Sequence, residues 1–113
     1  MFNILRTEEF IEWFKEIDII AKKDIFIAIE VLSHFGPSLG RPHVDTLKGS
    51  KVSNLKELRV RSNGRPFRII FVFDPKRNAV LLIGGNKAEK KDFYEKMIKK
   101  AEKIYFQYLS ELE

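Results

Sequence analysis

The sequence predicts an α+β fold with the element order β-α-α-β-β-β-α. Three observations support this class: apolar residues recur at helical spacing in the first third of the chain, short alternating or apolar runs separated by turn residues fill positions 55–85, and one apolar stripe runs through a lysine-rich C-terminal segment. With 113 residues the chain has room for one modest core, so we expect residues 1–113 to form a single domain.

The N-terminal segment predicts a short edge strand over Phe2 to Leu5 and then a helix. Thr7 followed by two glutamates is typical of a helix start, because a hydroxyl caps the first N–H groups and negative charge favours the positive end of the helix dipole. The helix then presents one apolar face formed by Phe10, Trp13, Phe14 and Ile17.

A second helix is expected over about Ile20 to Phe35. Gly36 and Pro37 should end it. Its predicted inward residues are Ala28, Val31, Leu32 and Phe35. The following segment, Pro37 to Asn54, has no helical or strand period and is interpreted as a functional loop.

Three strands in a meander should follow. Leu55 to Val60 alternates, which places Glu57, Arg59 and Arg61 on one face. Phe67 to Phe73 also alternates, with Phe67, Ile69, Phe71 and Phe73 on one face and Arg68, Ile70 and Val72 on the other. Ala79 to Gly85 is apolar throughout, as expected of a central strand covered on both sides.

The last element should be a long helix from about Ala88 to Leu112. Lysines cover its predicted outer face. Its predicted inner stripe is Tyr94, Met97, Ile98, Ala101, Tyr105, Tyr108 and Leu109.

The net charge of +5 is unevenly distributed along the chain. Residues 1–36 carry four basic and seven acidic side chains, a local charge of −3. Between Leu47 and Arg68 there are seven cations and one anion, Glu57. A field polarised in this way attracts a polyanion, so we favour nucleic acid over a merely solubilising surface.

Composition excludes several other classes. A hydrophobic content of 44% with 33% charged residues argues against disorder. The chain has no cysteine, so it has no disulfide or thiolate metal site, which fits a cytoplasmic protein. No apolar run approaches the roughly 18 to 20 residues that span a bilayer, and the N-terminus turns acidic too soon for a secretory signal. No His, Asp or Glu pair has metal-ligand spacing, so we expect no metal and no cofactor.

Several motifs together resemble the HigB-like branch of the RelE/ParE superfamily. They are LGRPHVDTLKGSK, LKELR, RPFRIIFVFDPKRNAVLLIGGNK and FYEKMI, in this order. The resemblance implies a RelE-like fold, with a small, mainly antiparallel sheet packed against two N-terminal helices and a C-terminal helix. It further implies the toxin of a type II toxin–antitoxin pair, a metal-independent endoribonuclease that cuts mRNA on the ribosome. The implied partner is an antitoxin, commonly with a helix-turn-helix DNA-binding domain.

Metal-free RNA cleavage needs a base for the 2′-hydroxyl, cations for the charged phosphorane and an acid for the leaving oxygen. Arg68 matches the arginine of the family's second core strand, and its planar guanidinium can hold two phosphate oxygens. Lys87 lies where relatives place a basic residue that holds phosphate or assists the leaving group. Tyr94 matches a tyrosine that stacks on a base or assists proton transfer, although a core role on its helix is an equal alternative.

The identity of the base stays open between Glu57 and His43. Glu57 is a general base or a structural partner of Arg59 or Arg68; surrounding cations favour its ionised form, so we lean to the structural interpretation. His43 lies in a basic loop and could act near neutral pH.

Further phosphate contacts are expected from the other cations of the basic segments. The predicted RNA-binding residues are Lys48, Lys51, Lys56, Arg59, Arg61, Arg65, Lys90 and Lys91. Since the strand LKELR departs from the lysines of well-known relatives, the alternative function is a non-catalytic toxin or a phage-derived RNA- or protein-binding module on the same fold.

Overall fold

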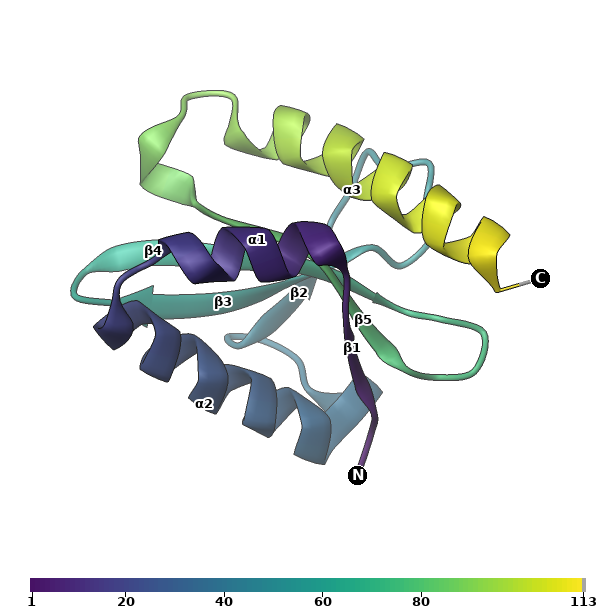
Figure 1. The fold of residues 1–113 in the computed structure, drawn as a ribbon, viewed down its shortest axis with the longest axis horizontal. Coiled ribbons are helices and arrows are strands. Elements are labelled where there is room, and N and C mark those ends of the chain that lie inside the picture. Colours follow the sequence, from purple (N-terminus) through teal and green to yellow (C-terminus); the bar gives the residue numbers. More distant parts are fainter. Residues whose placement is uncertain (113) are drawn as a thin grey trace.

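A five-stranded mixed sheet forms the centre of the protein, as seen in a computed structural model that describes residues 1–112 (Figure 1). The strand order is β1-β5-β4-β3-β2, with β1 parallel to β5 and every other neighbouring pair antiparallel. The elements are β1 (Ile4–Arg6), α1 (Glu8–Glu16), α2 (Ile19–Phe35), the 3-10 helix η1 (Gly36–Ser38), β2 (Val44–Thr46), β3 (Lys56–Ser62), β4 (Arg65–Phe73), β5 (Ala79–Asn86), the 3-10 helix η2 (Lys87–Glu89) and α3 (Phe93–Glu111). The α+β class and the mainly antiparallel sheet are confirmed.

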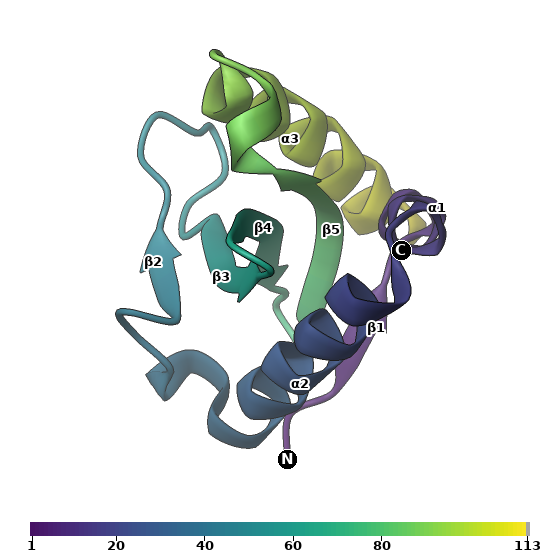
Figure 2. The same cartoon turned by 90° about the vertical axis from the view of Figure 1, so that its left-hand side faces the viewer.

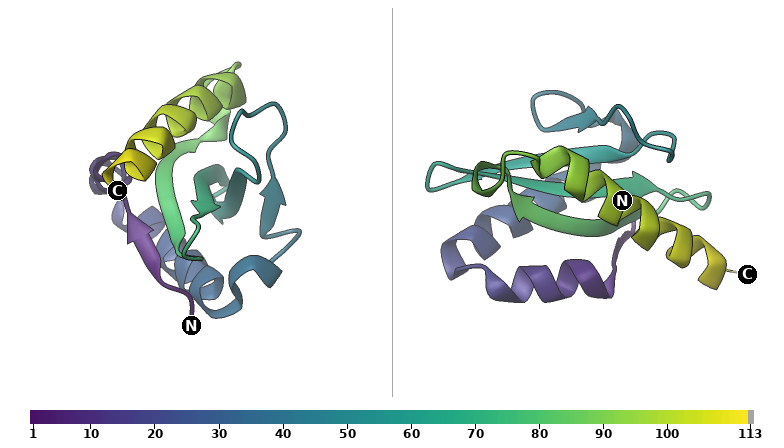
Figure 3. Two further views of the ribbon diagram at one scale, coloured as in Figure 1. Left: turned by 90° about the vertical axis from the view of Figure 1, so that its right-hand side faces the viewer. Right: turned by 90° about the horizontal axis from the view of Figure 1, so that it is seen from above.

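Helices cover both faces of the sheet. The pair α1 and α2 lies on one face and α3 lies on the other (Figures 2 and 3). Alternation along β4 separates the two cores, because successive side chains of a strand point to opposite faces. Phe67, Ile69 and Phe71 join the core beneath α1 and α2, whereas Ile70 and Val72 join the core beneath α3. The predicted faces of this strand are therefore confirmed.

The predicted start of the first helix is confirmed at Thr7. Its hydroxyl accepts the N–H of Phe10 at 3.2 Å and donates to the carbonyl of Leu82 at 2.8 Å. One side chain thus caps α1 and fastens it to β5. Gly84 of β5 lies directly beneath the Trp13 ring, and a Cβ at this position would collide with that ring.

The predicted inner face of the second helix is only partly correct. The buried residues of α2 are Ala21, Ile25, Ile29 and Leu32, and Phe35 is 50% exposed. The prediction failed because α2 is apolar on several sides, so the spacing of its apolar residues does not single out one face. Even so, no helix within residues 1–112 is both long and apolar enough to cross a bilayer.

The segment Pro37 to Asn54 contains a strand that the sequence does not predict. Residues Val44–Thr46 form β2 and pair with Lys56, Glu57 and Leu58 of β3. Three residues are too few to establish a period-2 pattern, and the pairing partner lies more than ten residues away. This edge strand brings Asp45 alongside Glu57.

The final helix begins later than predicted. The chain forms η2 over Lys87–Glu89, Lys90 is extended, and α3 starts at Phe93. Lys90 and Lys91 therefore lie in a connection rather than on the helix. Phe93, which was not assigned to the inner stripe, is 5% exposed and belongs to the core beneath α3.

Asp74 ties the β4–β5 turn to α3. Its buried carboxylate accepts the backbone N–H groups of Lys76 and Asn78, the Asn78 amide and the Tyr108 hydroxyl, the last at 2.8 Å. Burial alone would raise the pKa of Asp74, but hydrogen bonds from Asn78, Tyr108 and Lys76 outweigh it and lower this pKa below its ordinary value. Burial and the bond to Asp74 raise the pKa of Tyr108 to about 12.

The Tyr108→Phe substitution should lower the free energy of unfolding by about 1–3 kcal/mol at pH 7, because a buried carboxylate loses a donor. This loss should shrink as the pH falls through the lowered pKa of Asp74, since protonation removes the charged acceptor. Urea denaturation between pH 3 and pH 7 measures it. Tyr105→Phe is the matched control, because the Tyr105 hydroxyl makes no hydrogen bond within the described residues; an equal effect of both substitutions would contradict the assignment.

Candidate active site

Strand register places Glu57, Arg59 and Arg68 together on the α3 side of the sheet. Arg59 and Arg68 are direct cross-strand partners, and Glu57 pairs with Ile70, one step along the same face. Residues two apart on a strand share a face, so Glu57 lies beside both arginines. The sequence predicted this face for β3 and β4 separately; the register brings the two sets together.

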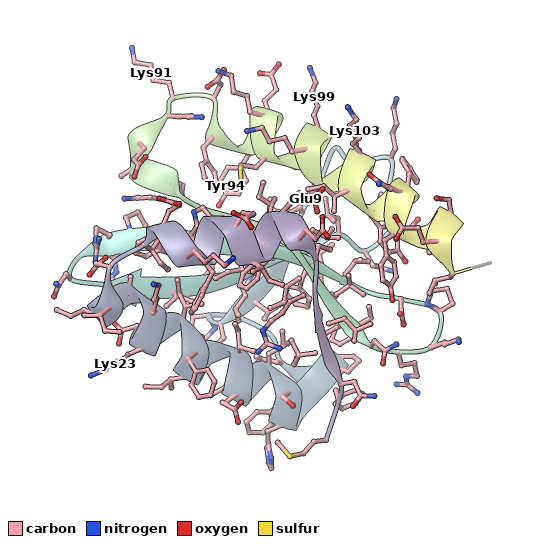
Figure 4. All side chains as sticks on the ribbon, viewed as in Figure 1. Glu9, Lys23, Lys91, Tyr94, Lys99 and Lys103 are labelled. Carbon is pink, nitrogen blue, oxygen red and sulfur yellow. The ribbon has the colours of Figure 1, made fainter. Side chains whose placement is uncertain are left out.

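Tyr94 reaches this cluster from the first turn of α3. Gly85, the β5 partner of Arg68, makes room for the start of that helix, because a Cβ at Gly85 would lie 2.9 Å from the Phe93 ring. Phe93 thus packs close to the sheet and its neighbour Tyr94 lies over the strands. In Figure 4, Tyr94 extends from α3 towards the sheet, whereas Lys91, Lys99 and Lys103 extend away from it.

The Glu57 carboxylate is the centre of the cluster. It is 3% exposed, and Oε1 accepts the Tyr94 hydroxyl at 2.6 Å and lies 3.4 Å from Arg68 Nε. Its other oxygen, Oε2, accepts Nε of Arg59 at 3.1 Å. Both oxygens are therefore occupied by protein donors.

The electrostatics of the cluster favour a neutral phenol and two charged guanidinium groups. Burial, together with the hydrogen bond to Glu57, raises the pKa of Tyr94. The hydrogen bond to Glu57 raises the pKa of Arg59. Tyr94 thus keeps its proton and donates it to the carboxylate at neutral pH, where it acts as a hydrogen-bond donor and not as a base.

Each arginine keeps part of its hydrogen-bonding capacity free. Arg68 uses Nε for Tyr94 and Nη1 for the Phe67 carbonyl, at 3.3 and 3.0 Å. Arg59 uses Nε and Nη2 for Glu57 and Asp45. Within residues 1–112, Arg68 Nη2 and Arg59 Nη1 have no hydrogen-bond partner. An external anion could accept hydrogen bonds from both.

Lys87 lies close to the cluster through Tyr94. Its Nζ is 5.5 Å from the centre of the Tyr94 ring, within the range of a cation–π contact. Lys87 is exposed on η2, directly after β5. The structure therefore gathers four of the five expected catalytic residues: Glu57, Arg68, Lys87 and Tyr94.

Asp45 belongs to the cluster although the sequence analysis did not select it. Its Oδ2 accepts Nη2 of Arg59 at 3.3 Å and Nε of Arg41 at 3.2 Å. The bond from Arg41 lowers the pKa of Asp45. A lone acid within the basic motif RPHVDTL was the available signal, but its link to Arg59 depends on the pairing of β2 with β3.

His43, the other candidate base, does not touch the carboxylate cluster. Its backbone carbonyl accepts the N–H of Arg59 at 2.8 Å. Its side chain is exposed and lines a hollow of about 190 Å³ that includes Arg59, Leu58 and residues of α2. No group of three or more His, Asp or Glu side chains within residues 1–112 is arranged to hold a metal ion.

Two of the expected RNA-binding residues point away from the cluster. Arg65 forms an ion pair with Asp18 at 2.8 Å, and its guanidinium lies 5.1 Å from the centre of the Phe67 ring on the α1–α2 side. Lys56 donates to Thr46 at 3.1 Å and shares its strand face with Leu58. Both contacts are structural in form.

The remaining expected contacts lie at the surface around the cluster. Arg61 donates to the Gly64 carbonyl at 3.3 Å and lies on the same strand face as Arg59. The loop before β3 is held against α3 by Glu102, which accepts from Ser50 and from the backbone of Lys51. The other exposed cations of this set are Lys48, Lys90 and Lys91.

Comparison with known proteins gives a consistent family. Residues 12–105 match the family described as phage-derived protein Gp49-like (DUF891). Two curated relatives from Mycobacterium tuberculosis are similar: the candidate toxin HigB2 is 43% identical over 109 residues, 95% of this chain, and the candidate toxin HigB3 is 46% identical over 76 residues, 67% of this chain. The match covers 54% of HigB2 and 65% of HigB3, so the chain spans about half to two thirds of their lengths.

A solved structure has the same fold. The crystal structure of the isolated E. coli RelE toxin aligns with a TM-score of 0.60 over 88% of this chain and 98% of that chain. The sequence identity of this alignment is 10%, so the likeness concerns the fold alone.

A double-mutant cycle tests the Tyr94–Glu57 bond. Tyr94→Phe should lower the free energy of unfolding by about 1–3 kcal/mol, because a buried carboxylate loses its closest donor. In a Glu57→Gln background the same change should cost less, with a coupling of about 0.5–3 kcal/mol, measured by chemical denaturation. Combining Tyr94→Phe with the distant Tyr108→Phe should be additive. Additivity of Tyr94→Phe with Glu57→Gln would contradict the geometry.

Proposed function

From the premise that this chain belongs to the phage-derived Gp49-like family and is a HigB-like toxin with a RelE-like fold, we propose that it is a metal-independent endoribonuclease that cleaves mRNA on the ribosome. Cleavage would stop translation and arrest growth. We further propose that a cognate antitoxin, with a helix-turn-helix DNA-binding domain, neutralises the chain.

The observation that carries this proposal is the pair of arginines facing each other across β3 and β4. Like charges directly opposite one another on a sheet destabilise it, and Glu57 balances only one of the two positive charges. The free Nη1 of Arg59 and Nη2 of Arg68 remain available to an outside acceptor. A phosphodiester supplies a negative charge and two oxygens, which suit a guanidinium pair.

The proposed reaction is attack of the 2′-hydroxyl on the adjacent phosphorus. The 2′ oxygen forms a bond to phosphorus, the bond to the 5′ oxygen breaks, and a 2′,3′-cyclic phosphate remains. The phosphorane gains negative charge during this step, and Arg68, 12% exposed and held by Glu57 and Tyr94, would stabilise it without reorganising.

Lys87 and Tyr94 have proposed roles beside Arg68. Lys87 would hold phosphate or give a proton to the leaving 5′ oxygen, because it is the exposed cation next to Tyr94. Tyr94 would orient Glu57 through its hydroxyl while its ring presents a surface to the substrate. The functional and structural alternatives for Tyr94 are thus compatible in one side chain.

For the base, we propose that Glu57 positions the arginines and that His43 accepts the 2′ proton. Both Glu57 oxygens already accept hydrogen bonds, so proton transfer to Glu57 would require these contacts to break. His43 is exposed and its backbone bonds to Arg59, which leaves the imidazole free to approach a substrate.

The other cations would contribute to RNA affinity without chemistry. Arg61, Lys48, Lys90 and Lys91 are exposed near the cluster or its adjacent loops and would contact backbone phosphates. Lys51, Lys56 and Arg65 remain candidates of the same kind, although the contacts of Lys56 and Arg65 lie on the other face.

Replacement of Arg68 is the main test. Arg68→Ala should reduce mRNA cleavage about 100-fold or more, since it removes a preorganised cation from the transition state. Arg68→Lys should restore only part of the activity, because an ammonium lacks the planar fork. Primer extension on mRNA translated in a purified system measures the cuts, with and without a chelator.

Arg77→Asn is the matched control for that test. It removes one positive charge from the β4–β5 turn, and asparagine tolerates the positive φ of 67° at this position. Wild-type chain that arrests growth without cutting any transcript would instead indicate a non-catalytic toxin.

Replacement of His43 tests the proposed base. His43→Asn should slow cleavage about 100-fold and leave the RNA dissociation constant nearly unchanged. Added imidazole should restore part of the rate to this variant but not to Arg68→Ala. If His43→Asn cleaves at the wild-type rate while Glu57→Gln does not cleave, the proton acceptor is Glu57.

A further inference from the structure

Helix α2 is apolar on nearly every side, although only one of its sides faces the core. Five of its large apolar side chains are about half exposed or more: Ile19 at 64%, Ile20 at 48%, Phe26 at 54%, Ile27 at 60% and Phe35 at 50%. A helix that is hydrophobic all round belongs in an interior. Exposed apolar side chains gathered in this number on one helix therefore indicate an interface.

A groove between α1 and α2 gives this surface a definite shape. Its hollow of about 220 Å³ is lined by Phe10, Ile11, Phe14, Phe26 and Ile29, with Arg6 and Lys15 also lining it. Phe26 and Ile11, exposed at 54% and 38%, lie on opposite walls of the groove. A groove between two helices with apolar walls suits one face of a third helix.

The flank of the groove on the α1 side is acidic. Four glutamates, Glu8, Glu9, Glu12 and Glu16, are exposed on α1, and Lys15 pairs with only one of them, Glu12, at 3.6 Å. Positions 8, 12 and 16 are four residues apart and so lie along one side of the helix. This flank would repel an anionic lipid surface or the same flank of a second copy, and it would attract a basic segment.

We propose that the outer face of α2 and the α1–α2 groove bind an amphipathic helix of another protein, whose apolar face enters the groove and whose basic residues lie against the α1 glutamates. This docking surface is on the face of the sheet opposite to α3 (Figure 3). A helix bound there leaves the Glu57–Arg68 cluster uncovered, so the binding is independent of the proposed cleavage.

The test is a selection of helical peptides on the full chain. A phage-displayed library with a constant apolar stripe and randomised flanking positions is panned on the wild-type chain, and selected peptides are measured by fluorescence anisotropy. Selected peptides should carry Lys or Arg along one flank. They should bind Phe26→Gln and Ile19→Gln at least tenfold more weakly than the wild type. Glu9→Lys, at the end of α1 labelled in Figure 4, should also weaken them.

Phe106→Gln is the matched control, because Phe106 is a 49% exposed aromatic residue on α3 and lies away from the docking surface. It should bind the peptides as the wild type does, and circular dichroism should show the same helix content for all variants. The proposal is overturned if no selected peptide depends on Phe26 or if the selected flanks are acidic. It is also overturned if the wild-type chain sediments as a dimer that Phe26→Gln dissociates, since the surface would then bind a second copy.

Discussion

The buried carboxylate of Glu57 is the constraint around which the α3 side of the molecule is arranged. A charged group that is 3% exposed must be compensated by donors close to it, or the cost of removing it from water is not recovered. Those donors come from three elements: Arg59 of β3, Arg68 of β4 and Tyr94 of α3. The same contacts that compensate Glu57 therefore set the direction of two guanidinium groups and of the first turn of α3.

The constraint extends to the sheet edge through Asp45. Arg59 bonds to both Glu57 and Asp45, and Asp45 also holds Arg41. This chain of alternating charges links the short strand β2 to the centre of the sheet. Because Arg41 and Asp45 are largely exposed to solvent compared with Glu57, their pair contributes less to stability than to the placement of Arg59.

The two faces of the sheet have different physical roles. On one face, α1 and α2 enclose a dry core in which Gly84 lets Trp13 approach β5. On the other face, α3 covers the distal half of the strands with Tyr105 and Met97, while the Glu57 cluster lies near its first turn. Polar groups can thus face solvent beside a rigid support, which is the arrangement that a preorganised anion site requires.

Much of the fold follows from local patterns in the sequence. Alternation in β4, the Thr7 cap of α1 and the apolar run of β5 each depend on residues within a few positions of one another, and all three were predicted. The basic segment around Arg59 and Arg68 and the isolated acid Glu57 were also evident, because strand alternation alone puts each on a known face.

The tertiary structure decided what depends on distant partners. The inner face of α2 could not be inferred, because apolar residues surround that helix and only contact with β3 and β4 selects Ile25 and Leu32 for burial. Likewise the start of α3 at Phe93, the strand β2 and the role of Asp45 depend on the register of strands and on the space above Gly85. By itself the sequence determined which side chains share a face; the desolvation of Glu57 and the pairing of β3 with β4 determined which of them meet.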